Sequence, residues 1–284
     1  VGPNVWNGWK GQLLRELYYA SETALTGGHI SEGRADRAQH KKDALRDHLK
    51  DWSTEELDRH LERFYESYWV ATSTETQAHH AELLRTADKS GETLTIHAES
   101  DPFRSVTEVT IYTSDHPGLF ARIAAAMSLS GANFVDAKIH TTTDGMALDT
   151  FVVQDSDGDV YDQGGRMSRF RSTIEDTLSG KLKAHLELEK RRQSALPSRT
   201  QVFKAQPSVL VNNVASNIHT VIEVRGRDRS GLLADLTRTM FTLSLTIASA
   251  HITTFGERVV DVFYVKDMFG LKITNKVKIK NIEK

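Results

Sequence analysis

The sequence contains no cysteine among its 284 residues, which excludes disulfides, thiol nucleophiles and thiolate metal sites from it. An excess of positive charge is also missing, since 36 basic residues face 38 acidic ones and the formal net charge is −2. Domains that bind nucleic acid through their surface usually have a pI above roughly 9. No apolar run approaches the roughly 18 residues that cross a bilayer, and no charged-then-apolar leader opens the chain. We therefore expect a soluble, cytoplasmic protein without a nucleic-acid or membrane partner.

One segment of the sequence is present twice. The run that begins Asp115-His-Pro-Gly118-Leu119 returns 113 residues later as Asp228-Arg-Ser-Gly231-Leu232. Further pairs of similar residues keep that spacing, or a spacing of 112 beyond a turn: Ile96 with Val209, Ala137 with Ala250, Ile139 with Ile252, and Asp149 with Asp261. Because insertions are tolerated in loops and not in packed elements, this pattern predicts two copies of one small domain.

The first ninety residues have helical periodicity and hold all four tryptophans. Apolar spacing predicts four helices, at 6–22, 35–49, 53–68 and 75–87, with a break at Thr26-Gly27-Gly28 after the first. The third helix opens with the capping box Ser53-Thr-Glu-Glu56. We expect the tryptophans to pack between helices rather than to stack on bases.

From Thr93 the periodicity becomes that of strands. Each copy predicts the order strand, strand, helix, strand, strand, helix. The expected elements are strands 93–98, 106–112, 134–142 and 146–154 with helices from 119 and at 166–178, then strands 209–212, 220–225, 246–253 and 259–266 with helices ending at 243 and starting near 272. The fold class is α+β, with a helical region (1–90), a first domain (91–180), a linker formed by a helix tail and solvated chain (181–204) and a second domain (205–284). Since the chain starts at Val1 without methionine and stops within this pattern, we expect a fragment.

The two βαββ units, each with Asp-x-x-Gly-Leu between first strand and first helix, resemble paired ACT domains, which are ferredoxin-like modules that sense amino acids. Four stretches extend the resemblance over the whole chain: 6–18, 25–29, 141–150 and 247–265. Together they resemble the C-terminal part of the bifunctional uridylyltransferase/uridylyl-removing enzymes that modify the PII nitrogen signal protein, and the α-proteobacterial members are most similar.

In that family a nucleotidyltransferase domain attaches UMP to PII, an HD-type hydrolase domain removes it, and the ACT pair senses glutamine. The resemblance thus implies a parent enzyme that uses Mg²⁺ and UTP. This chain has neither catalytic signature: none of its twelve histidines precedes an aspartate, and no Gly-Ser loop precedes a paired-aspartate strand. We expect it to be the regulatory end, with no catalytic residue, metal ligand or cofactor of its own.

The repeated Asp-x-x-Gly loops are the candidate ligand sites. Each stands at a helix N-terminus, where free backbone N–H groups and the helix dipole favour a carboxylate. Asp115 and Asp228 could receive an α-ammonium group, or they could only cap the helices. Asn133 enters the strand beside the loop, where its amide could pair with a glutamine side chain or simply form a turn. The candidate amino-acid-binding residues are Asp115, His116, Pro117, Gly118, Leu119, Asn133, Phe134, Val135, Asp228, Arg229, Ser230, Gly231, Leu232, Thr246 and Ile247.

Other polar residues carry weaker signals. Asp149 and Asp261 lie in apolar strands and, as single acids, are expected to face outward. Asp155, Asp157 and Asp159 fail the EF-hand pattern because its glycine and glutamate are not in place. The His79-His80 pair has no acid at ligand spacing and is expected at the surface.

The extra strand before each copy could occupy the sheet edge that a missing last strand would leave. Two such sheets could then pair side by side, within or between chains, with ligand between them. Two alternatives stay open: a structural or dimerisation module that binds no ligand, and the amino-acid-sensing part of another metabolic enzyme.

Overall fold

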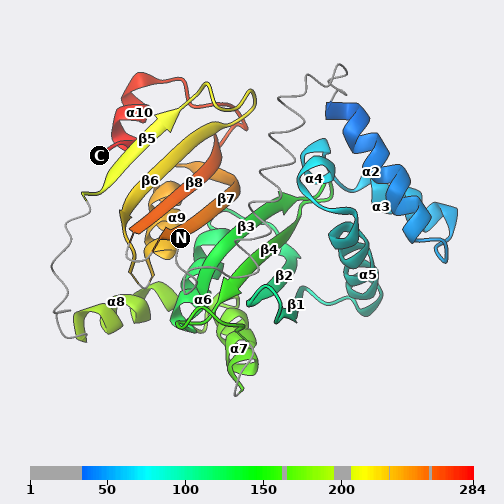
Figure 1. The fold of residues 1–284 in the computed structure, drawn as a ribbon, viewed down its shortest axis with the longest axis horizontal. Coiled ribbons are helices and arrows are strands. Elements are labelled where there is room, and N and C mark those ends of the chain that lie inside the picture. Colours follow the sequence, from blue (N-terminus) through cyan, green and yellow to red (C-terminus); the bar gives the residue numbers. More distant parts are fainter. Residues whose placement is uncertain (1–33, 162–164, 195–205, 230, 256–257) are drawn as a thin grey trace.

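The structure is a computed structural model that describes residues 34–161, 165–194, 206–229, 231–255 and 258–284. The helix expected at 6–22, the glycine break after it and Ser230 lie outside the described residues. From Arg34 onward the elements follow the expected order of helices and then two strand-rich copies (Figure 1).

A single antiparallel sheet of eight strands carries both copies, in the order β1-β2-β4-β3-β7-β8-β6-β5. The first half consists of β1 (Leu94–Asp101), β2 (Val106–Ser114), β3 (Asn133–Thr141) and β4 (Met146–Gln154). The second consists of β5 (Ser208–Asn212), β6 (Thr220–Arg227), β7 (Leu245–Phe255) and β8 (Arg258–Asp267). The α+β class is confirmed, and the extra strands β1 and β5 lie at the two outer edges of the sheet.

The two half-sheets meet where β3 pairs with β7. The register joins Asp136 to His251, Ala137 to Ala250, and Lys138 to Ser249. Each of these strands has a register shift at the same repeat position, between Phe134 and Asp136 in β3 and between Ile247 and Ser249 in β7. The copies are therefore related by an approximate two-fold axis at this junction.

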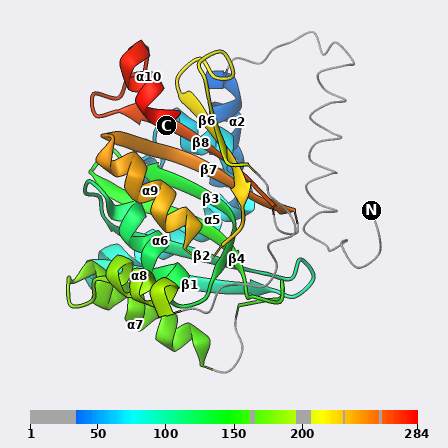
Figure 2. The same ribbon diagram turned by 90° about the vertical axis from the view of Figure 1, so that its left-hand side faces the viewer.

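One face of the sheet is covered by helices of both copies (Figure 2). These are α6 (Leu119–Leu129), α7 (Arg166–Leu178), α8 (Ala184–Ser194) and α9 (Leu232–Thr242), with the short α10 (Lys276–Ile282) beside β5. In α6 every residue from Ile123 to Ser128 is buried, because this helix lies between the sheet, α7, α8 and α9. A single apolar core runs beneath both copies as a result.

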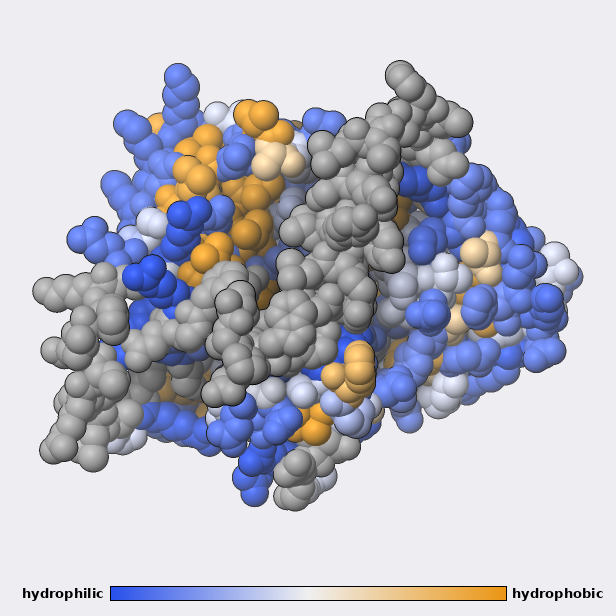
Figure 3. All heavy atoms as spheres, viewed as in Figure 1, coloured by the Kyte–Doolittle hydropathy of each residue, from blue (hydrophilic) through white to orange (hydrophobic). Residues whose placement is uncertain are grey.

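Among the described residues, helices cover the opposite face only over the first half-sheet. Four helices form this layer: α2 (Arg34–His48), α3 (Thr54–Glu62), α4 (Glu66–Ala71) and α5 (Thr74–Ser90). Their core includes the buried Trp69 and reaches the sheet through Tyr112 and Leu148. Over the second half-sheet, partly buried apolar residues such as Val262 and Tyr264 remain on this face, where Figure 3 shows apolar side chains gathered at the upper left.

The helix expected at 53–68 is divided into α3 and α4, so that prediction is wrong in its extent. Ser53 does cap α3, since its side chain accepts the N–H of Glu56. At the other end, the carbonyl of Arg63 accepts a hydrogen bond from the N–H of Thr143 at 2.9 Å. That carbonyl would bond to the N–H four residues later in a continuous helix. The turn between β3 and β4 therefore supplies the hydrogen bond at which α3 ends.

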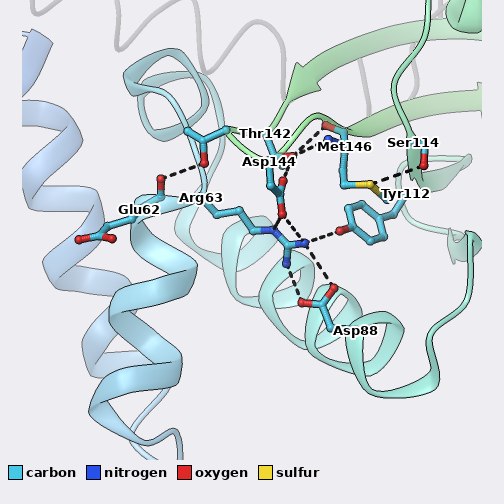
Figure 4. Close-up of polar contacts among 9 residues, drawn as sticks. Glu62, Arg63, Asp88, Tyr112, Ser114, Thr142, Asp144 and Met146 are labelled. Atoms are coloured by element: carbon cyan, nitrogen blue, oxygen red, sulfur yellow. Dashed lines mark hydrogen bonds and ion pairs between the residues drawn. The ribbon is translucent and has the colours of Figure 1, made fainter.

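Arg63 fastens the helical region to the first copy (Figure 4). Its guanidinium donates to Asp88 of α5 at 2.7 Å and to Asp144 of the β3–β4 turn at 2.9 Å. It also donates to the hydroxyl of Tyr112, on β2, at 2.5 Å. Residues of α5, β2 and the β3–β4 turn thus all bind the side chain of Arg63. These hydrogen bonds add to the apolar contact between the helical layer and the sheet.

Two further expectations are corrected. His80 is not at the surface: it is 1% exposed, and its ring nitrogens contact the Tyr68 hydroxyl (3.0 Å) and the Thr150 hydroxyl (3.1 Å), which joins the helical layer to β4. The segment after 181 is not simply solvated chain, because α8 buries Ala184 and Leu188 in the core of the copies. Within the part of the chain that the structure describes, no helix is both long and apolar enough to cross a membrane.

Candidate functional site

The two Asp-x-x-Gly loops place glycine at the start of α6 and α9. Gly118 and Gly231 are the N-cap residues, with φ of 81° and 76°, and neither helix has a side-chain cap. The interpretation of Asp115 and Asp228 as helix caps is therefore wrong. The positive φ is a conformation that glycine adopts without strain. The first N–H of each helix, that of Leu119 or Leu232, donates to the carbonyl of the residue three positions earlier, and the next N–H groups are those that favour an anion.

Asn133 does not lie beside the loop of its own copy. It follows the C-terminal end of α6, whereas the loop precedes the N-terminal end, and 11 residues of α-helix separate the two by about 16 Å. The two-fold relation instead brings Asn133 to the loop of the other copy. A cleft there has walls from both copies: Ser128, Gly131, Ala132, Asn133 and Phe134 from the first, and Asp228, Arg229, Gly231, Leu232, Leu233, Ile252, Val259 and Asp261 from the second.

This cleft between copies is narrow. Its volume is about 70 Å³, room for roughly two or three water molecules. On one wall the Asn133 amide donates to the backbone carbonyl of Asp155 at 3.0 Å, which fits the turn role left open for it. On the other wall Arg229 forms an ion pair with Asp235 of α9 at 2.5 Å. Val135 stands at the register shift of β3 and is partly buried.

Asp149 and Asp261 do not face outward, contrary to expectation. Each is 1% exposed. Side chains alternate between the two faces along β4 and β8, and both aspartates point to the face that α6, α7, α8 and α9 cover. Asp261 lines the cleft between copies. Asp149 holds the equivalent position under the first loop. Burial, reinforced by the charge of Asp115, raises the pKa of Asp149 well above its usual range. The strand pattern failed as a guide because helices cover this face and leave no solvent side.

At the first loop a large side chain stands where the cleft between copies has a small one. The repeat spacing of 113 places Phe241 at the position of Ser128, and the Phe241 ring lies against Gly118. A Cβ atom built on Gly118 would come within 3.2 Å of that ring. At Gly231 the nearest side chain is Leu188 of α8, 3.6 Å from such a Cβ. Thr246 and Ile247 follow α9 as Asn133 and Phe134 follow α6. The two loops thus differ chiefly in the side chain opposite the glycine.

Residues of β3 and α6 in the first copy bind the polar side chains of the first loop. Asp115 accepts a hydrogen bond from the Thr141 hydroxyl at 2.8 Å. His116 contacts Arg122 at 3.4 Å, and Arg122 donates to carbonyls at the end of α7, including that of Leu178 at 2.8 Å. Leu119 is buried in the core, while Pro117 is exposed. Asp115 is thus already held by its own copy.

Sequence reasoning missed seven of the lining residues: Ser128, Gly131, Ala132, Leu233, Ile252, Val259 and Asp261. The repeat itself held a signal that could have found Ser128, because the residue 113 positions later is a phenylalanine. A small residue aligned with a large one marks a place where two otherwise similar sites differ in space. The cleft between copies can therefore offer an uncapped helix start, a buried carboxylate and a strand end, all within one narrow site.

Comparisons with known proteins agree with the fold and with the resemblance in sequence. Residues 215–284 match the family described as the ACR family N-terminal ACT domain. The bifunctional uridylyltransferase/uridylyl-removing enzyme of Azospirillum brasilense is 48% identical over 283 residues, which cover 99% of this chain and 30% of the relative. The chain is a homologue of one segment of these enzymes. Enzymes of the same name from Rhodospirillum rubrum (45% identical, 99% of this chain) and Gluconobacter oxydans (44%, 98%) match in the same way. The chain spans about 30% of the length of each.

Proposed function

We propose that this chain is the glutamine-responsive regulatory segment of an enzyme that uridylylates and deuridylylates the PII signal protein. The observation that carries the proposal is the cleft between copies, because its walls come from both and any ligand in it touches both. The parent activity, its Mg²⁺ and UTP, its PII partner and a cytoplasmic location are parts of this proposal that rest on the similar enzymes and the resemblance.

The chemistry of the cleft suits the head group of an α-amino acid. The start of α9 has no side-chain cap, so its N–H groups can receive the α-carboxylate. Asp261 on the cleft wall and Asp228 in the loop can receive the α-ammonium group. Asp261 is 1% exposed, so an ammonium group that reaches it is shielded from water, and charges attract more strongly there than at an exposed acid. The Asn133 wall then faces the ligand side chain.

The size of the cleft links binding to a change in arrangement. A volume of about 70 Å³ is far below the roughly 300 Å³ at which small-molecule pockets usually begin. An amino acid therefore enters only if the loop at Gly231 moves from Asn133 or from Leu188 of α8. Ligand binding and the relative position of the copies are then coupled, and such coupling is reciprocal in free energy.

The proposal assigns one ligand to each chain. Phe241 lies where Ser128 stands in the cleft between copies, so the first loop lacks the space that the second has. Asp115 is also engaged by Thr141. The division of roles between the loops follows from these two contacts.

Calorimetry with a panel of amino acids tests the proposal. Glutamine is expected to bind with a stoichiometry of one, and Asp261→Asn is expected to abolish the heat while far-ultraviolet circular dichroism stays unchanged. The matched control is Asp149→Asn, which alters the equivalent acid under the blocked loop and should leave binding intact. No heat at millimolar glutamine with a folded chain would overturn the proposal. Tighter binding of another amino acid would favour a sensor from a different pathway.

The ligand-free structural module makes a different prediction. The copies already pair through β3 and β7, which leaves β1 and β5 as the outer strands of the sheet. A dimerisation module would associate through such edges and show a dimeric mass at all concentrations. Sedimentation with and without glutamine separates the two functions, because only a sensor changes its behaviour with the ligand.

A further inference from the structure

A cluster of metal-binding side chain types lies where the helical region meets the edge of the sheet. His79 comes from α5, while His97 and Glu99 come from the edge strand β1, two residues apart and therefore on one face. This is the face that points to the helical layer, since Ile96 and Ala98 point to the opposite core. The cluster is far in sequence from both Asp-x-x-Gly loops.

The three side chains are close enough for one ion. The imidazole rings of His79 and His97 have centroids 4.4 Å apart, and Nδ1 of His79 lies 3.9 Å from Oε2 of Glu99. One donor atom from each residue lies within 4.8 Å of the other two. A tetrahedral Zn²⁺ with bonds of about 2.0–2.2 Å holds its ligand atoms roughly 3.3–3.6 Å apart. Small rotations of three partly exposed side chains supply the difference.

The electrostatic surroundings also favour a cation. Glu99 lies directly opposite Glu108 of β2, and like charges opposite each other destabilise a sheet. An ion bound to Glu99 would relieve this repulsion.

The two histidines are open to an incoming ion. Among the described residues, neither ring takes part in a hydrogen bond, and the side chain of His79 is 37% exposed, so an ion can reach it. Two imidazoles and a carboxylate are a ligand set that Zn²⁺ uses in proteins, with a fourth position left for water.

We propose that His79, His97 and Glu99 form a binding site for a divalent transition-metal ion, with Zn²⁺ the best match, which fastens α5 to the edge strand β1. The site joins the helical region to the first copy on the side of α5 that faces away from Arg63. It is independent of the proposed amino-acid cleft.

Metal titration of the 284-residue chain, stripped with chelator and dialysed, tests this proposal. Zn²⁺ is expected to bind with a stoichiometry of one and to raise the thermal midpoint by several degrees, because only the folded state brings α5 and β1 together. Co²⁺ should give the visible absorption of a four-coordinate site. Binding should weaken in acid, since protons compete with the metal for the imidazoles.

Variants decide whether these residues are the ligands. His97→Ala and Glu99→Gln should each weaken Zn²⁺ binding by about tenfold or more, a loss of roughly 1.4 kcal/mol. His251→Gln is the matched control. His251 is also an exposed histidine close to an acid, Asp136, but it does not belong to the proposed metal site. Circular dichroism checks that each variant folds, and His79→Gln is a second ligand variant if His97→Ala does not. Unchanged affinity in the folded ligand variants, or an equal loss in His251→Gln, would overturn the proposal.

Discussion

Ala137 and Ala250 are the same residue in the two copies, and they pair directly with each other across β3 and β7. Both are fully buried. A position that pairs with its own repeat lies on the two-fold axis that relates the copies. The whole arrangement follows from this contact, because the axis brings the end of α6 to the start of α9. A larger side chain at either alanine would separate the half-sheets and disturb the cleft between copies.

Exchanging the residues at Ser128 and Phe241 is expected to exchange the properties of the two loops. Ser128→Phe should fill the cleft between copies and weaken glutamine binding by about tenfold or more, which corresponds to roughly 1.4 kcal/mol. Phe241→Ser should free the space at Gly118 and raise the stoichiometry toward two. Isothermal titration calorimetry measures both quantities.

The control for these two variants is Thr242→Ser, an exposed change next to Phe241 in α9. It should alter neither the affinity for glutamine nor the stoichiometry. If Ser128→Phe binds as the unaltered chain does, the ligand is not in the cleft between copies. If Phe241→Ser leaves the stoichiometry at one, Phe241 is not what distinguishes the loops.

Asp149→Asn is expected to stabilise the chain, and more so as the pH rises. Burial raises the pKa of Asp149, so the folded state prefers the protonated acid. The stability that this preference gives is present below about pH 4 and is lost as the pH rises toward the folded pKa. One oxygen, Oδ1, has no hydrogen-bond partner among the described residues, so removing the charge should gain about 1–3 kcal/mol at neutral pH. Denaturant unfolding at several pH values measures the gain. A difference between variant and unaltered chain that does not change with pH would contradict this account.

Acid is expected to release the helical region. Burial lowers the pKa of His60 and of His140 to about 4, and it lowers the pKa of His80 well below its usual range. Each folded-state pKa lies below the ordinary value of 6.5, so the stability present above that pH is lost as the pH falls toward 4. The loss is roughly 1.4 kcal/mol per pH unit for each histidine. Tryptophan fluorescence against pH should report it through the buried Trp69.

The variant His60→Phe distinguishes the contribution of His60 to this pH dependence from those of His80 and His140. It keeps ring contacts like those of His60 with Trp52 and Phe64, and Nε2 of His60 has no hydrogen-bond partner among the described residues. The slope of stability against pH should fall by about one proton. An unchanged slope would show that His60 does not titrate with folding.

Arg63→Met is expected to weaken the attachment of the helical region to the first copy. The variant keeps much of the apolar stem but loses the hydrogen bonds to Asp88, Asp144 and Tyr112. A loss of about 1–3 kcal/mol should follow, because these bonds involve a partly buried charge. Hydrogen exchange should show faster exchange in α5 and in the β3–β4 turn. Arg46→Met is the control, since the exposed pairs of Arg46 with Asp43 and Asp58 should be worth at most about 1 kcal/mol. Equal losses from both variants would contradict the role of Arg63.

Local patterns predicted the elements well where the sequence repeats itself. The strand ends at Val106, Met146 and Gln154 and the helix 166–178 agree with the structure. The turn at Asp144-Gly145 also forms, with Gly145 at a φ of 81°. These features depend on alternation and on glycine, which act over a few residues.

Contacts between distant segments could not be predicted in this way. Thr143 ends α3 from 80 positions away, and α8 is held by its packing on α6. His80 and Asp149 are buried because helices cover both faces of β4, which no pattern within that strand reveals. Asn133 lies beside the loop of the second copy only because the two-fold axis brings them together, and the pattern of one copy does not contain that axis. The sequence indicated the residue types of the site, and the fold decided which of them meet.

A crystal structure of the chain with glutamine tests the central claim most directly. The account predicts one glutamine per chain, with its carboxylate at the start of α9 beside Gly231, its ammonium group at Asp261 and Asp228, and its side chain toward Asn133. The cleft should be wider than its present volume of about 70 Å³. Glutamine at the first loop beside Phe241, or bound away from both loops, would contradict the account.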